Sequence, residues 1–200
     1  LVSSSSTFIG TSLQRIPYPT LLLNNNNNNN NNNPSMMVLR RCITTMGLQI
    51  KIRMVGRKNG SEGWLDDAYR MYETRLSSSS SVAVETIWHK TNAELIQGVT
   101  LDRTKGHSMV VLDSKGATMT SEIFATNMYQ WLDQGGSRLV FVIGGADGLP
   151  SELLTPNSAA KKEQLLSLSS LTFTHQFART LLMEQIYRAT EIRKGSGYHK

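Results

Sequence analysis

A run of five apolar residues constrains the fold of this chain more than any other feature. Residues 138–143 read RLVFVI, so apolar side chains stand on both faces of the strand that this run predicts. Such a strand is typical of the middle of a parallel sheet that helices cover on both sides. Gly144 and Gly145 follow directly and Gly148 comes soon after, which is more glycine than a plain turn needs.

Strand-like and helix-like patterns alternate through the rest of the chain. Further strands are expected at 48–55, 82–88 and 108–113. Helices are expected at about 59–76, 93–97, 120–136, 151–154 and 176–193, and the segment 165–173 returns to the core. Asn59, with Glu62 three positions on, is the expected start of the first helix. This alternation predicts an α/β fold with a mainly parallel sheet flanked by helices.

Three of the predicted helices show the face by which they would pack. The expected inward residues lie three and four positions apart, which is the spacing of one helix face. They are Trp64, Leu65, Ala68, Tyr72 and Leu76 in the first helix, Phe124, Met128, Trp131 and Leu132 in the second, and Leu182, Ile186 and Ala189 in the last. A serine run, 77–81, is expected to be a flexible link after the first helix.

The first 47 residues differ from the rest in composition. They contain serine runs and the tract Asn24–Asn33, with three arginines and no acidic residue. Such a polar tract cannot bury enough apolar surface to fold, so we expect a disordered leader over 1–47 and one domain over 48–200. A leader rich in serine and arginine is typical of an organellar transit peptide, here of a plastid in preference to a mitochondrion. The alternative is an extension without an address, which would leave the protein in the cytoplasm.

Charge and cysteine content exclude several classes of protein. The net charge is +6, but three of the 21 basic residues and none of the 15 acidic ones lie in the leader, so the domain is only mildly basic. This charge permits RNA binding without arguing for it. Cys42 is the only cysteine, and the four histidines are not paired at metal-ligand spacing, so neither a disulfide nor a metal site is expected. No segment is long and apolar enough to predict a membrane span.

The glycine loop after the central strand has two interpretations. Its GGxxG pattern matches neither the dinucleotide fingerprint nor the phosphate loop. It is either a loop whose backbone touches a ligand closely or a tight turn between a strand and a helix. Ligands of open α/β sheets lie beyond the carboxyl ends of the strands, so Gly144 and the pair Leu112–Asp113 mark the expected site.

The last helix and the tail carry the polar residues with the most chemistry. His175 stands where the returning segment meets the helix, a place where histidines are often structural. Glu184 and Arg188 are spaced as an i,i+4 ion pair, for which a surface role is the simpler interpretation. Tails such as Tyr198–Lys200 are usually disordered.

Three motifs, in this order and spacing, resemble one family. They are LVFVIGGADGL at 139–149, LSLSSLTFTHQFARTLLMEQIYRA at 166–189 and GYHK at 197–200. From about Leu48 to Lys200 the chain resembles the ribosomal RNA large subunit methyltransferase H family. These are small SPOUT-class enzymes that methylate N3 of a pseudouridine in the assembled ribosome.

The resemblance implies a fold, a partner and a cofactor. The C-terminal part would be tied in a trefoil knot, and the protein would be a homodimer that uses S-adenosylmethionine. Glycine would let the cofactor lie against the loop where side chains would collide. Cofactor-binding positions match Leu112, Gly144, Gly145, Leu168, Ser169, Ser170, Leu171, Thr172 and Phe173.

The resemblance also implies a catalytic set, with the tail completing the partner subunit's site. Its members match His175, Arg179, Glu184, Tyr198 and His199. Two departures from the family pattern stand out: Thr174 replaces a proline, which predicts a less rigid loop, and the segment 88–109 lacks a clear long helix. They keep two alternatives open, a non-catalytic ribosome-binding assembly factor and a SPOUT methyltransferase with another RNA target.

Overall fold

The computed structural model of the chain describes residues 47–58, 62–154 and 163–200. The predicted leader, except for Gly47, lies outside these residues, as does Asn59, from which the first helix was expected to start. Among the described residues, no helix is long and apolar enough to cross a membrane.

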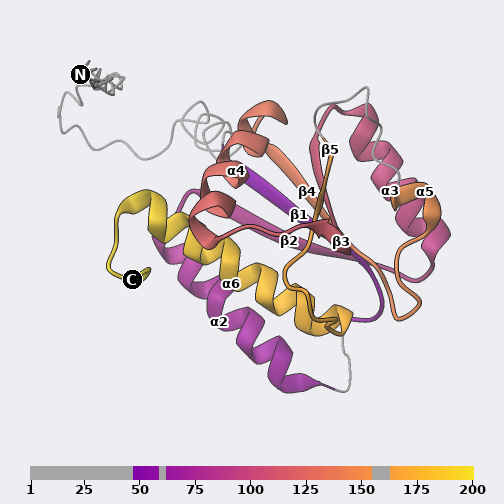
Figure 1. Cartoon of the computed structure of the whole chain (residues 1–200), viewed down its shortest axis with the longest axis horizontal. Helices are drawn as coiled ribbons and strands as arrows, with labels where there is room; N and C mark the ends of the chain where they lie inside the picture. Colours follow the sequence, from indigo (N-terminus) through magenta and orange to yellow (C-terminus); the bar gives the residue numbers. More distant parts are fainter. Residues whose placement is uncertain (1–46, 59–61, 155–162) are drawn as a thin grey trace, which may run out of the picture.

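Strands and helices alternate along the described chain (Figure 1). The strands are β1 (Leu48–Val55), β2 (Val82–His89), β3 (Ser108–Ala117), β4 (Arg138–Ile143) and β5 (Glu163–Leu166). The helices are α2 (Gly63–Ser79), α3 (Asn92–Thr104), α4 (Ser121–Gln134), α5 (Ser151–Leu154) and α6 (His175–Lys194).

The five strands form one parallel sheet in the order β2-β1-β4-β3-β5. The central position of β4 is confirmed, because it pairs with β1 on one side and β3 on the other. Its residues 139–143 are all buried. Leu139, Phe141 and Ile143 pack into the core on one face of the sheet, and Val140 and Val142 pack into the core on the other.

Helices cover both faces of this sheet, as the sequence predicts (Figure 1). Helices α2, α4 and α6 pack together over one face, where α6 lies against both of the others. Helices α3 and α5 lie over the opposite face, where Leu95, Val99 and Leu153 are buried. The arrangement is a three-layer α/β fold.

The expected inward faces of two helices are confirmed. Phe124, Met128, Trp131 and Leu132 of α4 are buried, and so are Leu182, Ile186 and Ala189 of α6. Helix α4 ends where the glycine pair predicts, with Gly135 as its C-cap.

The expected inward face of α2 is wrong at one end, and the serine link is partly wrong. Trp64 is 62% exposed, and the buried residues of α2 are Leu65, Tyr69 and Leu76. A helix buries only one stripe, and Trp64 lies beside that stripe. The helix also continues through Ser79, and the hydroxyls of Ser77 and Ser78 donate hydrogen bonds to carbonyl groups of the preceding turn.

The segment 88–109 contains a helix of 13 residues, α3, so the expectation that it lacks one is wrong. The side chain of Thr91 caps the helix by accepting a hydrogen bond from the N–H of Glu94. The apolar pattern was hard to recognise because a charged residue, Asp102, is buried and because a glycine, Gly98, lies in the middle of the helix.

Asp102 is fully buried and is surrounded by cationic and imidazole groups. Its carboxylate accepts a hydrogen bond of 2.7 Å from Nε of Arg53 and lies 3.4 Å from Nζ of Lys51. Burial alone would raise the pKa of Asp102, but the hydrogen bond and charge of Arg53 outweigh it and lower the pKa. A Cβ atom at Gly98 would come within 2.5 Å of Arg53 Nη1, so a small residue at position 98 leaves room for this pair.

We predict that Asp102→Ala lowers the free energy of unfolding by about 3–5 kcal/mol, because it leaves the Arg53 cation buried without its partner. Asp67→Ala is the matched control, since Asp67 pairs with Arg70 at the surface; a change of at most about 1 kcal/mol is expected there. Denaturant unfolding measures both. Equal losses in the two variants would contradict this account.

The same pair predicts a pH dependence. Because the pKa of Asp102 is lowered in the folded protein, its stabilising contribution is present above about pH 4, the usual pKa of an unfolded carboxyl group. The contribution is lost as the pH falls below that value. Unfolding of the wild-type protein and of Asp102→Asn between pH 7 and pH 3 checks this, with the difference between them shrinking towards low pH.

Candidate active site

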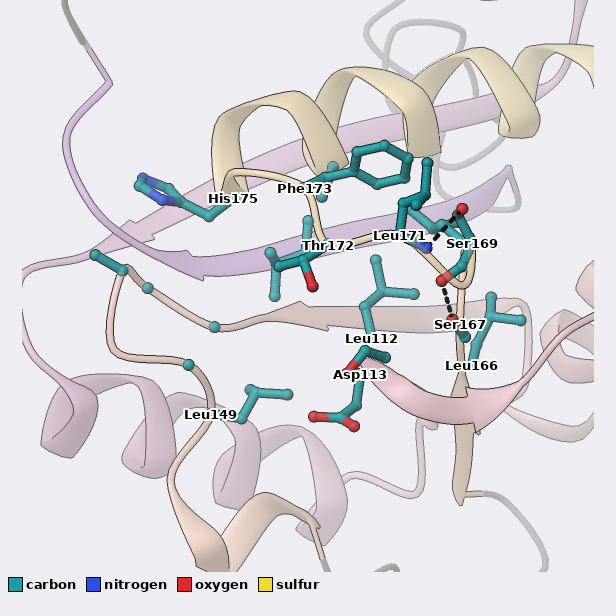
Figure 2. Close-up of a pocket in the computed structure, with 18 residues that line it drawn as sticks. Leu112, Asp113, Leu149, Leu166, Ser167, Ser169, Leu171, Thr172, Phe173 and His175 are labelled. Carbon is teal, nitrogen blue, oxygen red and sulfur yellow. Dashed lines mark hydrogen bonds between the residues drawn. The ribbon is translucent and has the colours of Figure 1, made fainter.

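A cavity of about 230 Å³ lies at the carboxyl ends of β3, β4 and β5 (Figure 2). Parallel strands bring their following loops to the same edge of a sheet, which is where such folds bind ligands. The lining comes from the end of β3, from the glycine loop after β4, from the loop between β5 and α6, and from the first turn of α6. Its members are Leu112–Ser114, Ile143–Ala146, Gly148, Leu149, Leu166–Ser169, Leu171–Phe173, His175 and Ala178.

The predicted cofactor-binding residues line this cavity, with one exception. Ser170 is exposed and is not part of the lining. Ala178 lines the cavity although nothing in its sequence context singled it out.

Serine side chains hold the loop between β5 and α6 in shape (Figure 2). The hydroxyl of Ser167 donates to the carbonyl of Ser169 at 2.7 Å, and the hydroxyl of Ser169 accepts from the N–H of Leu171 at 3.0 Å. Thr174 then caps α6 by accepting from the N–H of Phe177 at 3.3 Å. The loop that was expected to lose rigidity without proline is therefore anchored by a cap.

The structure shows a tight turn at the glycine loop. A Cβ atom at Gly144 would lie 2.6 Å from the carbonyl carbon of Gly148, so the first obstacle is the loop's own backbone and not a ligand. The N–H of Gly148 donates to the carbonyl of Gly145 at 3.0 Å, and Gly148 has a φ of +82°. The turn therefore requires a residue without a side chain at position 144. The backbone of this turn lines the cavity.

His175 is the one predicted catalytic residue that lines the cavity. It is the first residue of α6. Its Nε2 would lie 3.3 Å from a Cβ atom built at Gly56, so the ring reaches the segment that follows β1. The side-chain amide of Gln176 donates to the carbonyl of Arg57 and holds the same segment against the helix.

Arg179 lies outside the cavity lining. Its buried guanidinium forms an ion pair with Asp66 of α2. It also stands over the rings of Tyr69 and Trp88, 4.3 Å and 4.9 Å from their centroids. Arg179 therefore joins α6 to α2 and β2, and its catalytic role stays a prediction.

The remaining predicted catalytic residues form a second cluster. Glu184 accepts from Arg188 Nη2 at 2.5 Å and from the hydroxyl of Tyr198 at 3.0 Å. Arg188 Nη1 lies 3.3 Å from Nδ1 of His199. Glu184 follows His175 by nine residues on α6, which is about 13 Å along the helix axis. The fold of the chain therefore brings Glu184, Tyr198 and His199 together but keeps them away from the cavity.

Glu122 of α4 extends this second cluster, and sequence reasoning missed it. Its Oε1 lies 2.8 Å from Nε2 of His199. Hydrogen bonds from Thr120 and His199 lower the pKa of Glu122 to about 2, so it is a carboxylate and can only accept. Nε2 of His199 is therefore the donor, and its Nδ1 faces the Arg188 donor as an acceptor. Glu122 is 77 residues from His199, and no local pattern connects them.

Tyr198 is held as a neutral phenol. Burial raises its pKa, and hydrogen bonds with Tyr72 and Glu184 raise it further. The hydroxyl therefore donates to Glu184 throughout the neutral pH range. Arg188 shares the same carboxylate, and its side chain and that of Glu184 are mostly buried, so the pair is more than a surface ion pair.

Among the residues that the structure describes, no group of three or more His, Cys, Asp or Glu side chains is arranged to hold a metal ion. The cavity instead offers apolar side chains and backbone, with Asp113 as a carboxylate at its wall. This lining suits a nucleoside with a cationic group. The volume is below the range of about 300–1,000 Å³ usual for enclosed ligand sites, so the cavity would enclose only part of such a ligand.

Comparison with known proteins identifies close relatives. The family described as "Predicted SPOUT methyltransferase" matches residues 48–199. A protein named ribosomal RNA large subunit methyltransferase H from Protochlamydia amoebophila is 45% identical over 152 residues, which are 76% of this chain and 99% of that protein. The protein of the same name from Prochlorococcus marinus is 38% identical and covers 70% of this chain and 89% of its own length.

A further relative with this name, from Ralstonia pickettii, is 33% identical and covers 76% of this chain and 99% of its own length. Among solved structures, a probable methylase family protein from Haemophilus influenzae Rd KW20 aligns with a TM-score of 0.43 and 12% identity. That alignment covers 76% of this chain and 70% of the other.

We predict that Gly144→Ala weakens adenosylmethionine binding by tenfold or more, about 1.4 kcal/mol, because the added methyl group would push the turn apart. Isothermal titration calorimetry measures the affinity. Gly63→Ala is the control, since nothing lies within 4 Å of a Cβ atom at that position. Unchanged affinity in Gly144→Ala would show that the turn does not shape the site.

Proposed function

The chain belongs to the family of predicted SPOUT methyltransferases, and we propose that it methylates N3 of a pseudouridine in large-subunit ribosomal RNA. Membership makes it a methyltransferase with the SPOUT fold, and S-adenosylmethionine is its cofactor. The observation that carries the proposed target is its 45% identity with a ribosomal RNA large subunit methyltransferase H over 99% of that protein.

The residues at the cavity fit this cofactor. Leu112 and Phe173 offer apolar contacts, the loop from Gly144 offers backbone groups, and Asp113 offers a negative charge that suits a sulfonium. When bound, the cofactor supplies an electrophilic methyl group whose leaving group departs neutral, so no acid is needed at that position. The chain's own residues then have to orient the base and deal with its N3 proton.

The proton at N3 of the target base limits the role of each polar residue. Tyr198 is excluded as the proton acceptor near neutral pH, because its raised pKa keeps the phenol protonated. His175 lines the cavity and can contact a base there. His199 carries an acceptor nitrogen, Nδ1, that faces Arg188. No single base is assigned among these groups.

The two separate clusters support a homodimer. His175 at the cavity and the group of Glu184, Tyr198 and His199 lie apart within one subunit. In a symmetric dimer the tail of one subunit can complete the cavity of its partner. The proposed function therefore includes a composite site built from both subunits. The ion pair between Arg179 and Asp66 would hold α6 in place against α2.

A trefoil knot belongs to the same proposal. Its support is the SPOUT family to which the chain belongs. In the structure, the chain that follows β5 lies directly against the end of β3. The N–H of Ser167 donates to the carbonyl of Ala117 at 2.9 Å, and a Cβ atom at Gly116 would lie 2.5 Å from the backbone of Leu166.

We propose the assembled ribosome as the substrate, and an organelle, a plastid in preference to a mitochondrion, as its location. A mildly basic domain should bind isolated RNA weakly. The serine-rich, acid-free leader supports the organelle. The non-catalytic alternative loses two of its reasons, because α3 is present and Thr174 caps α6.

The first test is methyl transfer by the full chain. We predict that the protein, given adenosylmethionine and intact bacterial-type ribosomes, produces methylpseudouridine in large-subunit rRNA, detected by mass spectrometry of nucleosides. His175→Ala and removal of Tyr198–Lys200 should each lower the rate by roughly 100-fold or more. Methylation of a different RNA would favour the other-target alternative. Adenosylmethionine binding without any methylation would favour the inert assembly factor.

A composite site also predicts complementation between two inactive variants. When His175→Ala and the tail deletion are co-expressed, about half of the dimers are mixed, and each has one complete site if the tail acts across the dimer. We therefore expect about a quarter of the wild-type rate in the same assay. A mixture as inactive as its parents, although mixed dimers are recovered through two affinity tags, would show that the tail acts within its own subunit.

A further inference from the structure

A group of aromatic rings begins at the cavity wall and extends to an exposed tryptophan, Trp64. Two of its members, Trp64 and Phe177, have no part in the chemistry described above. The indole of Trp64 lies 6.2 Å from the ring of Phe177, and the ring of Phe173 lies 5.5 Å from Phe177 on its other side. Phe173 also lines the cavity. We call Trp64, Phe173 and Phe177 the aromatic surface; it runs outwards from the cavity across the start of α6 to the start of α2.

The aromatic surface is not explained by the core. Trp64 is 62% exposed and belongs to neither apolar cluster, whereas Trp131 is buried. Leu171, beside Phe173 in the chain, is 70% exposed. An exposed tryptophan whose neighbouring rings are only partly buried leaves apolar surface in water, and such surface often marks a place where something binds.

A segment that carries two cations is held against the first turn of α6, which also carries Phe177 of the aromatic surface. Arg57 and Lys58 are exposed on the segment after β1. The hydrogen bond from Gln176 to the carbonyl of Arg57 holds that segment against the first turn of α6, next to His175. Two acidic residues nearby have their charge neutralised by ion pairs, because Asp66 pairs with Arg179 and Asp67 with Arg70. Glu62 is a further acidic residue at the start of α2.

We propose that the aromatic surface stacks a nucleobase that flanks the methylated one, while Arg57 and Lys58 contact the phosphates of the same strand. Aromatic planes beside cations are the combination by which proteins hold single-stranded RNA. Because Phe173 belongs both to the cavity and to the aromatic surface, the stacked base is a neighbour of the target. The proposal rests on the proposed function and adds the recognition of a flanking nucleotide.

The charge beside the rings favours RNA over a protein as the occupant. A second copy of the chain would also cover Trp64 and Phe177, but it would have to place groups of its own against Arg57 and Lys58. A strand of RNA supplies both the ring faces and the negative charges. A protein occupant is an outcome that the experiments below distinguish.

Fluorescence gives a direct test. Of the three tryptophans, Trp64 is exposed, Trp88 is partly buried and Trp131 is buried. The probe is a single-stranded hexanucleotide of uridine, added to the full-length protein at low salt. Quenching of the wild-type emission is expected, and Trp64→Phe should lose that quenching while Trp131→Phe keeps it. Equal quenching in wild type and Trp64→Phe would overturn the stacking. This readout does not depend on methyl transfer.

Kinetics with intact ribosomes tests the functional consequence. Trp64→Ala should raise KM for ribosomes roughly tenfold, within the range for the loss of one stacked base, while adenosylmethionine affinity is unchanged. Trp64→Phe, which keeps a ring, should stay within about threefold of the wild type. Leu101→Ala is the control, because Leu101 is 52% exposed on α3, on the opposite face of the sheet.

Three results would overturn the proposal or its premise separately. An unchanged KM in Trp64→Ala, with an active wild type, would remove the aromatic surface from RNA recognition. A smaller mass of Trp64→Ala in analytical ultracentrifugation would assign the rings to the subunit interface instead. A wild type that methylates no large-subunit rRNA would refute the proposed function, while the hexanucleotide experiment would still decide whether Trp64 stacks on RNA.

Discussion

The pairing of β4 with β1 on one side and β3 on the other is the constraint on which the rest of the structure depends. A strand that is apolar on both faces and hydrogen-bonded along both edges has to be covered by helices above and below. Because its neighbours run parallel to it, their loops leave at one edge of the sheet. The cavity is thus a consequence of the way in which the core is filled.

Helix α6 connects this core to the polar groups of the site, because it packs on the core and carries residues of both polar clusters. It packs against α2 and α4, and the ion pair between Arg179 and Asp66 fixes it laterally. A rigid helix of 20 residues sets the separation between His175 at its start and Arg188 near its end. The division of polar groups into two clusters therefore follows from helix length.

The sequence predicts the elements of this fold well where apolar patterning is regular. The bounds of β1 and the inward faces of α4 and α6 follow directly from spacing. Prediction from the sequence fails where polar groups are buried or apolar ones are exposed. The buried Asp102 breaks the apolar pattern of α3, and the exposed Trp64 was expected to face inwards. Both depend on partners distant in the chain, Arg53 in one case and Phe177 in the other. The cavity was predictable from strand ends, whereas Glu122 became visible only in three dimensions.

The contacts of the tail have a genetic consequence. Tyr198 and His199 reach Glu184 and Glu122 without entering the apolar core. A stop codon in place of the codon for Tyr198 would thus leave the sheet, its helices and the cavity lining intact while removing that network. Such an allele would encode a folded protein, so quality control that degrades misfolded chains would not eliminate it. Only selection on what the tail does can preserve those codons.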